Sequence, residues 1–152
     1  MGRVRKWTRS DFPRIVELGQ KIHDESTYYV VYGFDESKVL AVLDRLEQSP
    51  SCESFVWEDS SGVIRGFIIG AVSRPLWFEE LSAEDIVFYV EQDARGRGVG
   101  VRLLTAYVRW AQSMNAEHIR LTTTSMIDVE ATDKVYQRLG FVPIGINYVF
   151  GG

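Results

Sequence analysis

The chain has 152 residues, of which 45% are hydrophobic and 25% are charged. These values are typical of one ordinary globular domain, and they exclude a disordered tail, a collagen-like fibre and a low-complexity scaffold. The 17 basic and 21 acidic residues give a net charge of −4, which argues against a dedicated nucleic-acid-binding protein. We therefore expect a single domain over residues 1–152 and no nucleic-acid partner.

Cysteine content and apolar patterning point to the cytoplasm. Cys52 is the only cysteine, so an internal disulfide is excluded and a reducing compartment is expected. The basic residues among the first seven are not followed by an apolar run, so they do not resemble a signal peptide. The longest apolar stretch, residues 66–72, is too short to span a bilayer. We expect a cytoplasmic protein that does not bind membranes.

The first third of the chain predicts one strand and two helices. Residues 3–8 form a candidate strand. Capping residues then precede Pro13, and apolar residues recur at three- and four-residue spacing, which predicts a helix over residues 10–23. An aromatic stretch with a glycine predicts a loop over residues 28–34, and a second apolar stripe predicts a helix over residues 35–48.

The rest of the chain predicts strands first and then alternating helices and strands. Turn residues separate the first two of these strands, which predicts an antiparallel hairpin. The predicted elements are strands over residues 54–58, 63–73 and 85–90, a helix over 99–114, a strand over 118–123, a helix over 128–139 and a last strand over 141–150.

The resulting element order is β-α-α-β-β-β-α-β-α-β, which predicts an α/β (α+β) fold with a mixed sheet. A helix connects the strands at 85–90 and 118–123. These two strands should therefore be parallel neighbours joined by a right-handed crossover.

The most informative segment runs from Arg95 to Gly100, between a predicted strand and a predicted helix. Its sequence is Arg-Gly-Arg-Gly-Val-Gly. Glycines let backbone N–H groups approach a ligand, and the first N–H groups of a helix lack internal partners and favour anions. Residues 94–112 contain four arginines and no acid. This pattern indicates a site for a phosphate or pyrophosphate.

Two common phosphate-binding motifs match this segment poorly. The P-loop requires a lysine followed by serine or threonine, whereas Val101-Arg102 stands here. The dinucleotide fingerprint requires Gly-x-Gly-x-x-Gly, whereas the spacing is Gly96-x-Gly98-x-Gly100. A nucleotide-binding domain, which would bind ATP or NAD, is therefore a weak alternative.

The pattern Arg95-x-x-Gly98-x-Gly100 resembles the acyl-CoA-binding signature of the GNAT superfamily of N-acetyltransferases. The surrounding residues support the resemblance: Val90 ends the preceding strand, Leu103-Leu104 lies in the helix, and Tyr136-x-x-x-Gly140-Phe141 resembles the family's helix ending. The resemblance implies the GNAT fold, a mixed and mostly antiparallel sheet with a β-α-β CoA-binding unit, flanked by about four helices.

The resemblance also implies acetyl-CoA as co-substrate and no metal. Backbone amides of residues 97–100 should hold the pyrophosphate, and main-chain groups near Val90 should pair with the pantetheine arm. Many members carry an asparagine where Val129 stands, so residues 124–128 are expected to supply substitute contacts. The implied cofactor-binding residues are Val90, Arg95, Gly96, Arg97, Gly98, Val99, Gly100 and Val101.

Tyr136 is the candidate general acid. A phenol with a pKa near 10 stays protonated at neutral pH and can donate to a departing thiolate. The alternative is a tyrosine packed on the helix with its hydroxyl at the edge.

Glu84 is the candidate general base. Residues 77–93 contain six acids and no basic residue. Strand alternation should place Glu84 on the face of Val90 and turn Asp85 to the other face. The alternative is an ordinary carboxylate at a strand end. As a group the acids could attract a cationic amine, or simply form a solvated face.

The aromatic side chains of two loops could line the acceptor pocket, or they could pack into the core beneath the loops. The loops contain Tyr28, Tyr29, Tyr32, Trp77 and Phe78. Neither histidine has a metal partner at ligand spacing, so both should be structural.

We therefore expect an acetyl-CoA-dependent N-acetyltransferase that moves an acetyl group to a primary amine by direct attack. The acceptor should be a small-molecule or peptide amine, and exposed edges of the last strand could support a homodimer. The alternative function is a non-catalytic acyl-CoA-binding sensor or partner module on the same fold.

Overall fold

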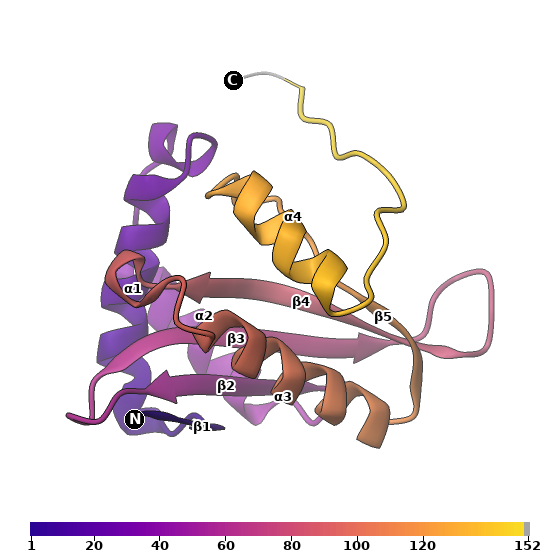
Figure 1. The fold of residues 1–152 in the computed structure, drawn as a ribbon, viewed down its shortest axis with the longest axis horizontal. Coiled ribbons are helices and arrows are strands. Elements are labelled where there is room, and N and C mark those ends of the chain that lie inside the picture. Colours follow the sequence, from indigo (N-terminus) through magenta and orange to yellow (C-terminus); the bar gives the residue numbers. More distant parts are fainter. Residues whose placement is uncertain (151–152) are drawn as a thin grey trace.

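A computed structural model describes residues 1–150 of the chain (Figure 1). Residues 151 and 152, which belong to the expected domain, lie outside the described residues. The strands are β1 (Arg3–Lys6), β2 (Cys52–Glu58), β3 (Ile64–Ser73), β4 (Leu81–Val90) and β5 (Ala116–Arg120). The α-helices are α1 (Phe12–Glu25), α2 (Glu36–Gln48), α3 (Val99–Ser113) and α4 (Val129–Arg138).

The strands form one sheet in the order β1-β2-β3-β4-β5. The first three pairings are antiparallel, and β4 pairs with β5 in parallel. The sheet is therefore mixed and mostly antiparallel, as predicted. The order of elements is also confirmed as far as α4.

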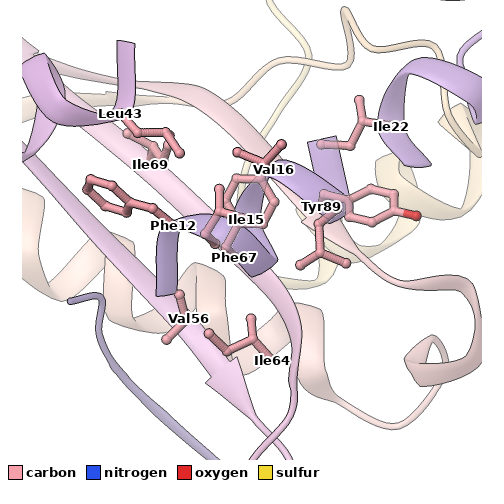
Figure 2. Packing of buried hydrophobic residues seen from close by; sticks show 11 residues of the cluster. Phe12, Ile15, Val16, Ile22, Leu43, Val56, Ile64, Phe67, Ile69 and Tyr89 are labelled. Atoms are coloured by element: carbon pink, nitrogen blue, oxygen red, sulfur yellow. The ribbon is translucent and has the colours of Figure 1, made fainter. Parts of the chain in front are cut away.

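Helices cover both faces of the sheet (Figure 1). On one face, α1 and α2 pack on β2, β3 and β4. Figure 2 shows Phe12, Ile15 and Val16 of α1 packed against side chains of β3. On the other face, α3 and α4 bury a second cluster that contains Leu103, Leu104 and Tyr136. Full burial of each large apolar side chain stabilises the fold by roughly 1.5–3 kcal/mol relative to exposure.

Side-chain carboxylates fix the starts of the first two helices. The Asp11 carboxylate accepts the backbone N–H of Thr8 at 2.7 Å and two hydrogen bonds from Arg5 at 2.8 and 3.0 Å. These bonds join β1 to the start of α1. The Asp35 carboxylate accepts the N–H of Lys38 at 3.1 Å, which is the expected helix cap.

The prediction of a last strand over residues 141–150 was wrong. This segment has no regular secondary structure and leads away from the end of α4 (Figure 1). Its alternating apolar side chains are exposed, with Ile144 and Ile146 each 78% exposed. A strand needs a neighbouring chain to pair with its N–H and C=O groups. Within residues 1–150 no strand pairs with this segment, so the alternation alone does not produce a strand.

No helix within the described residues combines the length and the apolar character needed to cross a lipid bilayer.

Candidate functional site

The whole of β5 pairs with β4, but only with the first residues of β4. The parallel ladder joins Leu81–Glu84 to Ala116–Arg120 and ends there. Residues 85–90 of β4 therefore have no partner on that edge. A cavity of about 540 Å³ lies beside them, lined by this part of β4, the start of α3, the segment after β5 and one side of α4. Its size is typical of small-molecule sites.

The open edge of β4 presents main-chain groups to this cavity. The Glu91 N–H donates to the Arg65 carbonyl of β3 at 2.7 Å. Val90, paired with Gly66, therefore occupies a non-hydrogen-bonded position of the antiparallel ladder, and its own N–H and C=O point away from β3. By the same alternation Phe88 also presents its N–H and C=O at the open edge.

The loop before α3 has the geometry of an anion site. Gly96 and Gly98 have positive φ angles of 76° and 79°, which glycine adopts without strain. The first intrahelical bond runs from the Arg102 N–H to the Gly98 carbonyl at 3.1 Å. The N–H groups of residues 99–101 precede that bond, and the first turn of α3 contains no acid. These features suit a phosphate or pyrophosphate.

Gly100 makes close packing possible at the same place. A Cβ atom on Gly100 would lie 3.3 Å from Cζ of Phe88. A larger residue would therefore push the start of α3 away from β4 and the cavity.

The structure brings most of the predicted cofactor-binding residues together. Those that line the cavity are Val90, Arg95, Gly96, Gly98, Gly100 and Val101. The Val99 side chain is buried in the core, and Arg97 is exposed outside the cavity lining. The Arg95 side chain bonds to Glu25 and to the Val90 carbonyl.

Tyr136 lies on the side of α4 that faces the sheet. It lines the cavity and is only 8% exposed. Its hydroxyl donates to the Thr122 carbonyl at 2.8 Å. Burial, with a further contribution from the Asp85 charge, raises the pKa of Tyr136 above 10.0, so the phenol stays protonated at neutral pH.

A β-bulge in β4 overturns the predicted orientation of Glu84 and Asp85. Ile69 pairs with Val87 but Gly70 pairs with Asp85, so Ile86 is an extra residue on β4. An inserted residue reverses the alternation of side chains. The expectation that Glu84 shares a face with Val90 was therefore wrong.

The two acidic side chains consequently have different surroundings. Glu84 accepts a hydrogen bond from Arg120 at 2.6 Å and is absent from the cavity lining. Asp85 lines the cavity, and its Oδ1 accepts the Thr122 N–H at 2.9 Å. Burial raises the pKa of Asp85 to about 6, although the bond from Thr122 acts in the opposite direction. The sequence-based reasoning missed Asp85 because nothing in the sequence indicated the bulge.

Few of the candidate aromatic residues reach the cavity. Tyr29 lines it, whereas Trp77 is 85% exposed and lies outside the lining. The buried Ser26 hydroxyl donates to the Ser125 carbonyl at 2.5 Å and accepts the N–H of Tyr29 at 2.9 Å. This pair of bonds holds Tyr29 beside the segment that follows β5.

Both histidines pack against an aromatic ring, and the His23 ring centroid lies 5.8 Å from that of Phe34. The ring of His118 lies 4.5 Å from that of Phe78. Across residues 1–150, no three His, Cys, Asp or Glu side chains gather in a group suited to a metal ion.

Comparison with known proteins assigns the chain to a family. A family model described as acetyltransferase (GNAT) family matches residues 3–141. The chain belongs to the GNAT acetyltransferase family. Membership supports acyl transfer as the general reaction. The glycine loop, residues 95–98, and the start of α3 that follows it fit an acyl-CoA co-substrate. A search of curated protein sequences found no significant match.

Solved GNAT structures share this fold over nearly the whole chain. An aminoglycoside N-acetyltransferase bound to a CoA bisubstrate analog has a TM-score of 0.81 and 18% identity, with 100% of this chain and 98% of that chain covered. Glucosamine-6-phosphate N-acetyltransferase from Arabidopsis thaliana has a TM-score of 0.77 and 16% identity, with 99% and 98% covered. An acetyltransferase from Trypanosoma brucei has a TM-score of 0.77 and 15% identity, with 99% of each chain covered.

Proposed function

We propose that this GNAT protein is an acetyl-CoA-dependent N-acetyltransferase that acetylates a primary amine. One observation carries the proposal. Thr122 bonds through its N–H to the Asp85 carboxylate and through its carbonyl to the Tyr136 hydroxyl, and both side chains line the cavity beside the glycine loop. A proton acceptor, Asp85, and a proton donor, Tyr136, are therefore bonded to the same backbone residue in the site.

The chain offers a matching set of groups for the co-substrate. The N–H groups at the start of α3 would hold the pyrophosphate, with Arg97 and Arg102 as nearby positive charges. The open edge of β4 would pair with the pantetheine arm through Phe88 and Val90. When bound, acetyl-CoA supplies a thioester carbonyl that an amine can attack.

Asp85 and Tyr136 divide the proton transfers between them. An ammonium group has no lone pair, so it must lose a proton before it attacks. With a pKa of about 6, Asp85 is ionised at neutral pH and accepts that proton. The neutral amine forms the new C–N bond as the C–S bond breaks, and Tyr136 donates its proton to the departing sulfur. The nitrogen then gives up its second proton to the Tyr136 phenolate, which leaves the amide, the CoA thiol and a restored phenol. The N–H groups of Phe88 and Val90 are the donors available to polarise the carbonyl.

Glu84, the base expected from the sequence, is the alternative to Asp85. Its carboxylate is partly exposed and paired with Arg120. Comparison of Asp85→Asn with Glu84→Gln distinguishes the two roles. We expect Asp85→Asn to lower kcat by about 100-fold, within the range for loss of a general base, and Glu84→Gln to leave it nearly unchanged.

The acceptor is proposed as a small-molecule or peptide amine. Among the structural neighbours, one is named as an aminoglycoside N-acetyltransferase and another as a glucosamine-6-phosphate N-acetyltransferase. In this chain Tyr29 and the hydroxyls of residues 122–125 line the cavity and could bind a polar acceptor.

The experiment is a thiol-release assay with acetyl-CoA and a panel of polyamines, amino sugars, amino acids and peptides. We expect release with at least one amine and its loss in Asp85→Asn. Binding of acetyl-CoA without release on any amine would instead favour a non-catalytic acyl-CoA-binding module.

A further inference from the structure

Glu25, the last residue of α1, contacts two residues at the edge of the cofactor site. One carboxylate oxygen accepts the Tyr89 hydroxyl, and the other accepts Nη2 of Arg95 at 2.7 Å. Tyr89 is only 3% exposed, so the carboxylate lies against a buried group. Figure 2 shows the Tyr89 oxygen at the edge of the apolar cluster. The end of α1 is thereby fastened to β4.

Arg95 is fixed at further points. Its Nε donates to the Val90 carbonyl at 2.8 Å, and its guanidinium carbon lies 5.5 Å from the centre of the Tyr89 ring. With Glu25, these contacts hold the guanidinium group against β4. We call this set of contacts, from Glu25 through Arg95 to Val90 and Tyr89, the brace. By contrast, Arg97 and Arg102 have no carboxylate partner within residues 1–150.

The position of Arg95 in the chain gives the brace its importance. It directly precedes Gly96, and Gly98 lies two residues further on; both have positive φ angles. Glycine restrains the backbone little, so this segment has little conformational restraint of its own. Fixing one end of such a segment lowers the entropy that is lost when a ligand binds. Arg95 also donates a hydrogen bond to the Val90 carbonyl, which lies at the open edge of β4.

We propose that Glu25 is a positioning residue for the co-substrate: it holds Arg95, and through Arg95 it fixes the glycine loop, residues 95–98, and so the position of the N–H groups at the start of α3 that bind the CoA pyrophosphate. The proposal rests on the proposed function. It also links the two sides of the site, because Ser26, the next residue, bonds to Ser125 and holds Tyr29 beside the cavity.

Glu25→Gln tests the proposal with little change in shape. The amide oxygen can still accept from Arg95 while the N–H₂ group donates to the Tyr89 hydroxyl, so the substitution removes the negative charge that faces Arg95 and keeps the shape. We expect the acetyl-CoA Kd and KM to rise roughly tenfold, because the charge-assisted hydrogen bond to Arg95 becomes a weaker one. We expect kcat to stay within about twofold, because Asp85 and Tyr136 keep their bonds to Thr122.

Glu17→Gln is the matched control on the same helix. Glu17 is 66% exposed at its side chain and bonds only to Arg14. We expect no change in acetyl-CoA affinity. An equal loss in both variants would overturn the proposal, because it would mark a general effect of charge on α1.

A double-mutant cycle tests whether Glu25 acts through Arg95. In Arg95→Gln the brace is already broken, so adding Glu25→Gln should change the Kd no further. Fully additive effects of the two substitutions would overturn the proposed route.

Tryptic cleavage of the ligand-free protein gives a readout that does not depend on acetyl-CoA. Trypsin cleaves after Arg95 and Arg97, and mass spectrometry identifies the sites. We expect faster cleavage there in Glu25→Gln than in the wild type or Glu17→Gln. Unchanged cleavage together with unchanged affinity would overturn the role of Glu25. If the wild type binds no acetyl-CoA, the proposed function fails, whereas the cleavage rates still decide whether Glu25 fixes the loop.

Discussion

Thr122 joins the two side chains on which the proposed chemistry depends. Its N–H and its carbonyl each bond to one of them, so the distance between Asp85 and Tyr136 is set by one backbone residue at the end of the parallel ladder. Burial raises the pKa of both groups. At neutral pH this leaves an ionised carboxylate and a protonated phenol in the same cavity.

Tyr136→Phe tests the general acid. It removes the proton donor and keeps the ring packed between Phe88 and Phe141. We expect kcat to fall by about 100-fold and the acetyl-CoA Kd to change little, since the pyrophosphate and pantetheine contacts lie elsewhere. Steady-state kinetics and titration calorimetry measure the two quantities. Undiminished turnover would contradict the assignment.

Asp85→Asn should stabilise the protein at alkaline pH. The pKa of Asp85 rises from 3.8 to about 6 on folding, so between these values the native state binds more protons than the unfolded state. Stability therefore falls as pH rises through this window and stays lower above it, by up to about 3 kcal/mol. Asparagine can still accept the Thr122 N–H and carries no charge.

The measurement is Tm as a function of pH. We expect the Tm of Asp85→Asn to exceed that of the wild type at pH 8, with the difference shrinking toward pH 4. A lower Tm for the variant at pH 8 would show that the Asp85 charge is not destabilising.

At the scale of elements, Glu91 links three parts of the fold. This residue follows β4 directly and is 3% exposed. Its carboxylate is paired with Arg14 and Lys21 of α1 and with Arg65 of β3. Burial alone would raise the pKa of Glu91, but the bonds from Lys21 and Arg65 outweigh it and lower the pKa to about 2. The cluster fixes the end of β4, which precedes the glycine loop by a few residues.

Glu91→Gln should destabilise the fold. It leaves three cations around a neutral amide, and loss of a buried ionic partner costs about 3 kcal/mol. The stabilisation by Glu91 is fully present above its ordinary pKa of 4.5 and is lost as pH falls toward 2. Urea unfolding at pH 7 and pH 3 measures it, and we expect a larger difference from the wild type at pH 7. Equal differences at both pH values would contradict the ionic role.

Helices and strands were predictable where apolar periodicity agrees with local caps and turns. Pro13, Asp35 and the turn after Glu58 marked boundaries that the structure confirms within a few residues. The orientation of Glu84 and Asp85 was not predictable, because the bulge at Ile86 depends on how β4 pairs with β3. The prediction of a strand over 141–150 was wrong for a related reason, because alternating apolar residues do not show whether a neighbouring strand is available for pairing.

At the scale of the whole molecule, the segment over 142–150 exposes the largest run of apolar side chains. Val142, Ile144, Ile146, Tyr148 and Phe150 alternate along it and are all exposed. The outer edge of β5 has no partner strand within the described residues. Exposed apolar segments and free edges favour association, so the homodimer expected from the sequence stays a prediction.

Light scattering after gel filtration tests this prediction. We expect the wild type to elute as a dimer and the double variant Ile144→Lys/Ile146→Lys to elute as a monomer, because lysines on one face of this exposed apolar segment oppose its pairing with a second copy. Asn147→Lys, at an alternate position of the same segment, is the control and should remain a dimer. A monomeric wild type at all concentrations would rule out the dimer.

The site itself was predictable only as far as its motif. The spacing of Arg95, Gly98 and Gly100 indicated an anion site, and the family match agrees with that interpretation. The brace formed by Glu25 was not predictable, because it joins residues 70 positions apart in the sequence. Long-range contacts of this kind depend on the packing of α1 against β4 rather than on any local pattern.

Titration calorimetry with acetyl-CoA tests most directly the central claim, that the glycine loop and the open edge of β4 form an acyl-CoA site. We expect micromolar binding, within the usual KM range of enzymes, and no heat with ATP or NAD. Gly100→Val should abolish binding, since even a Cβ there lies 3.3 Å from Phe88. Equal affinity in the wild type and in Gly100→Val, or no binding of acetyl-CoA by the wild type, would contradict the claim.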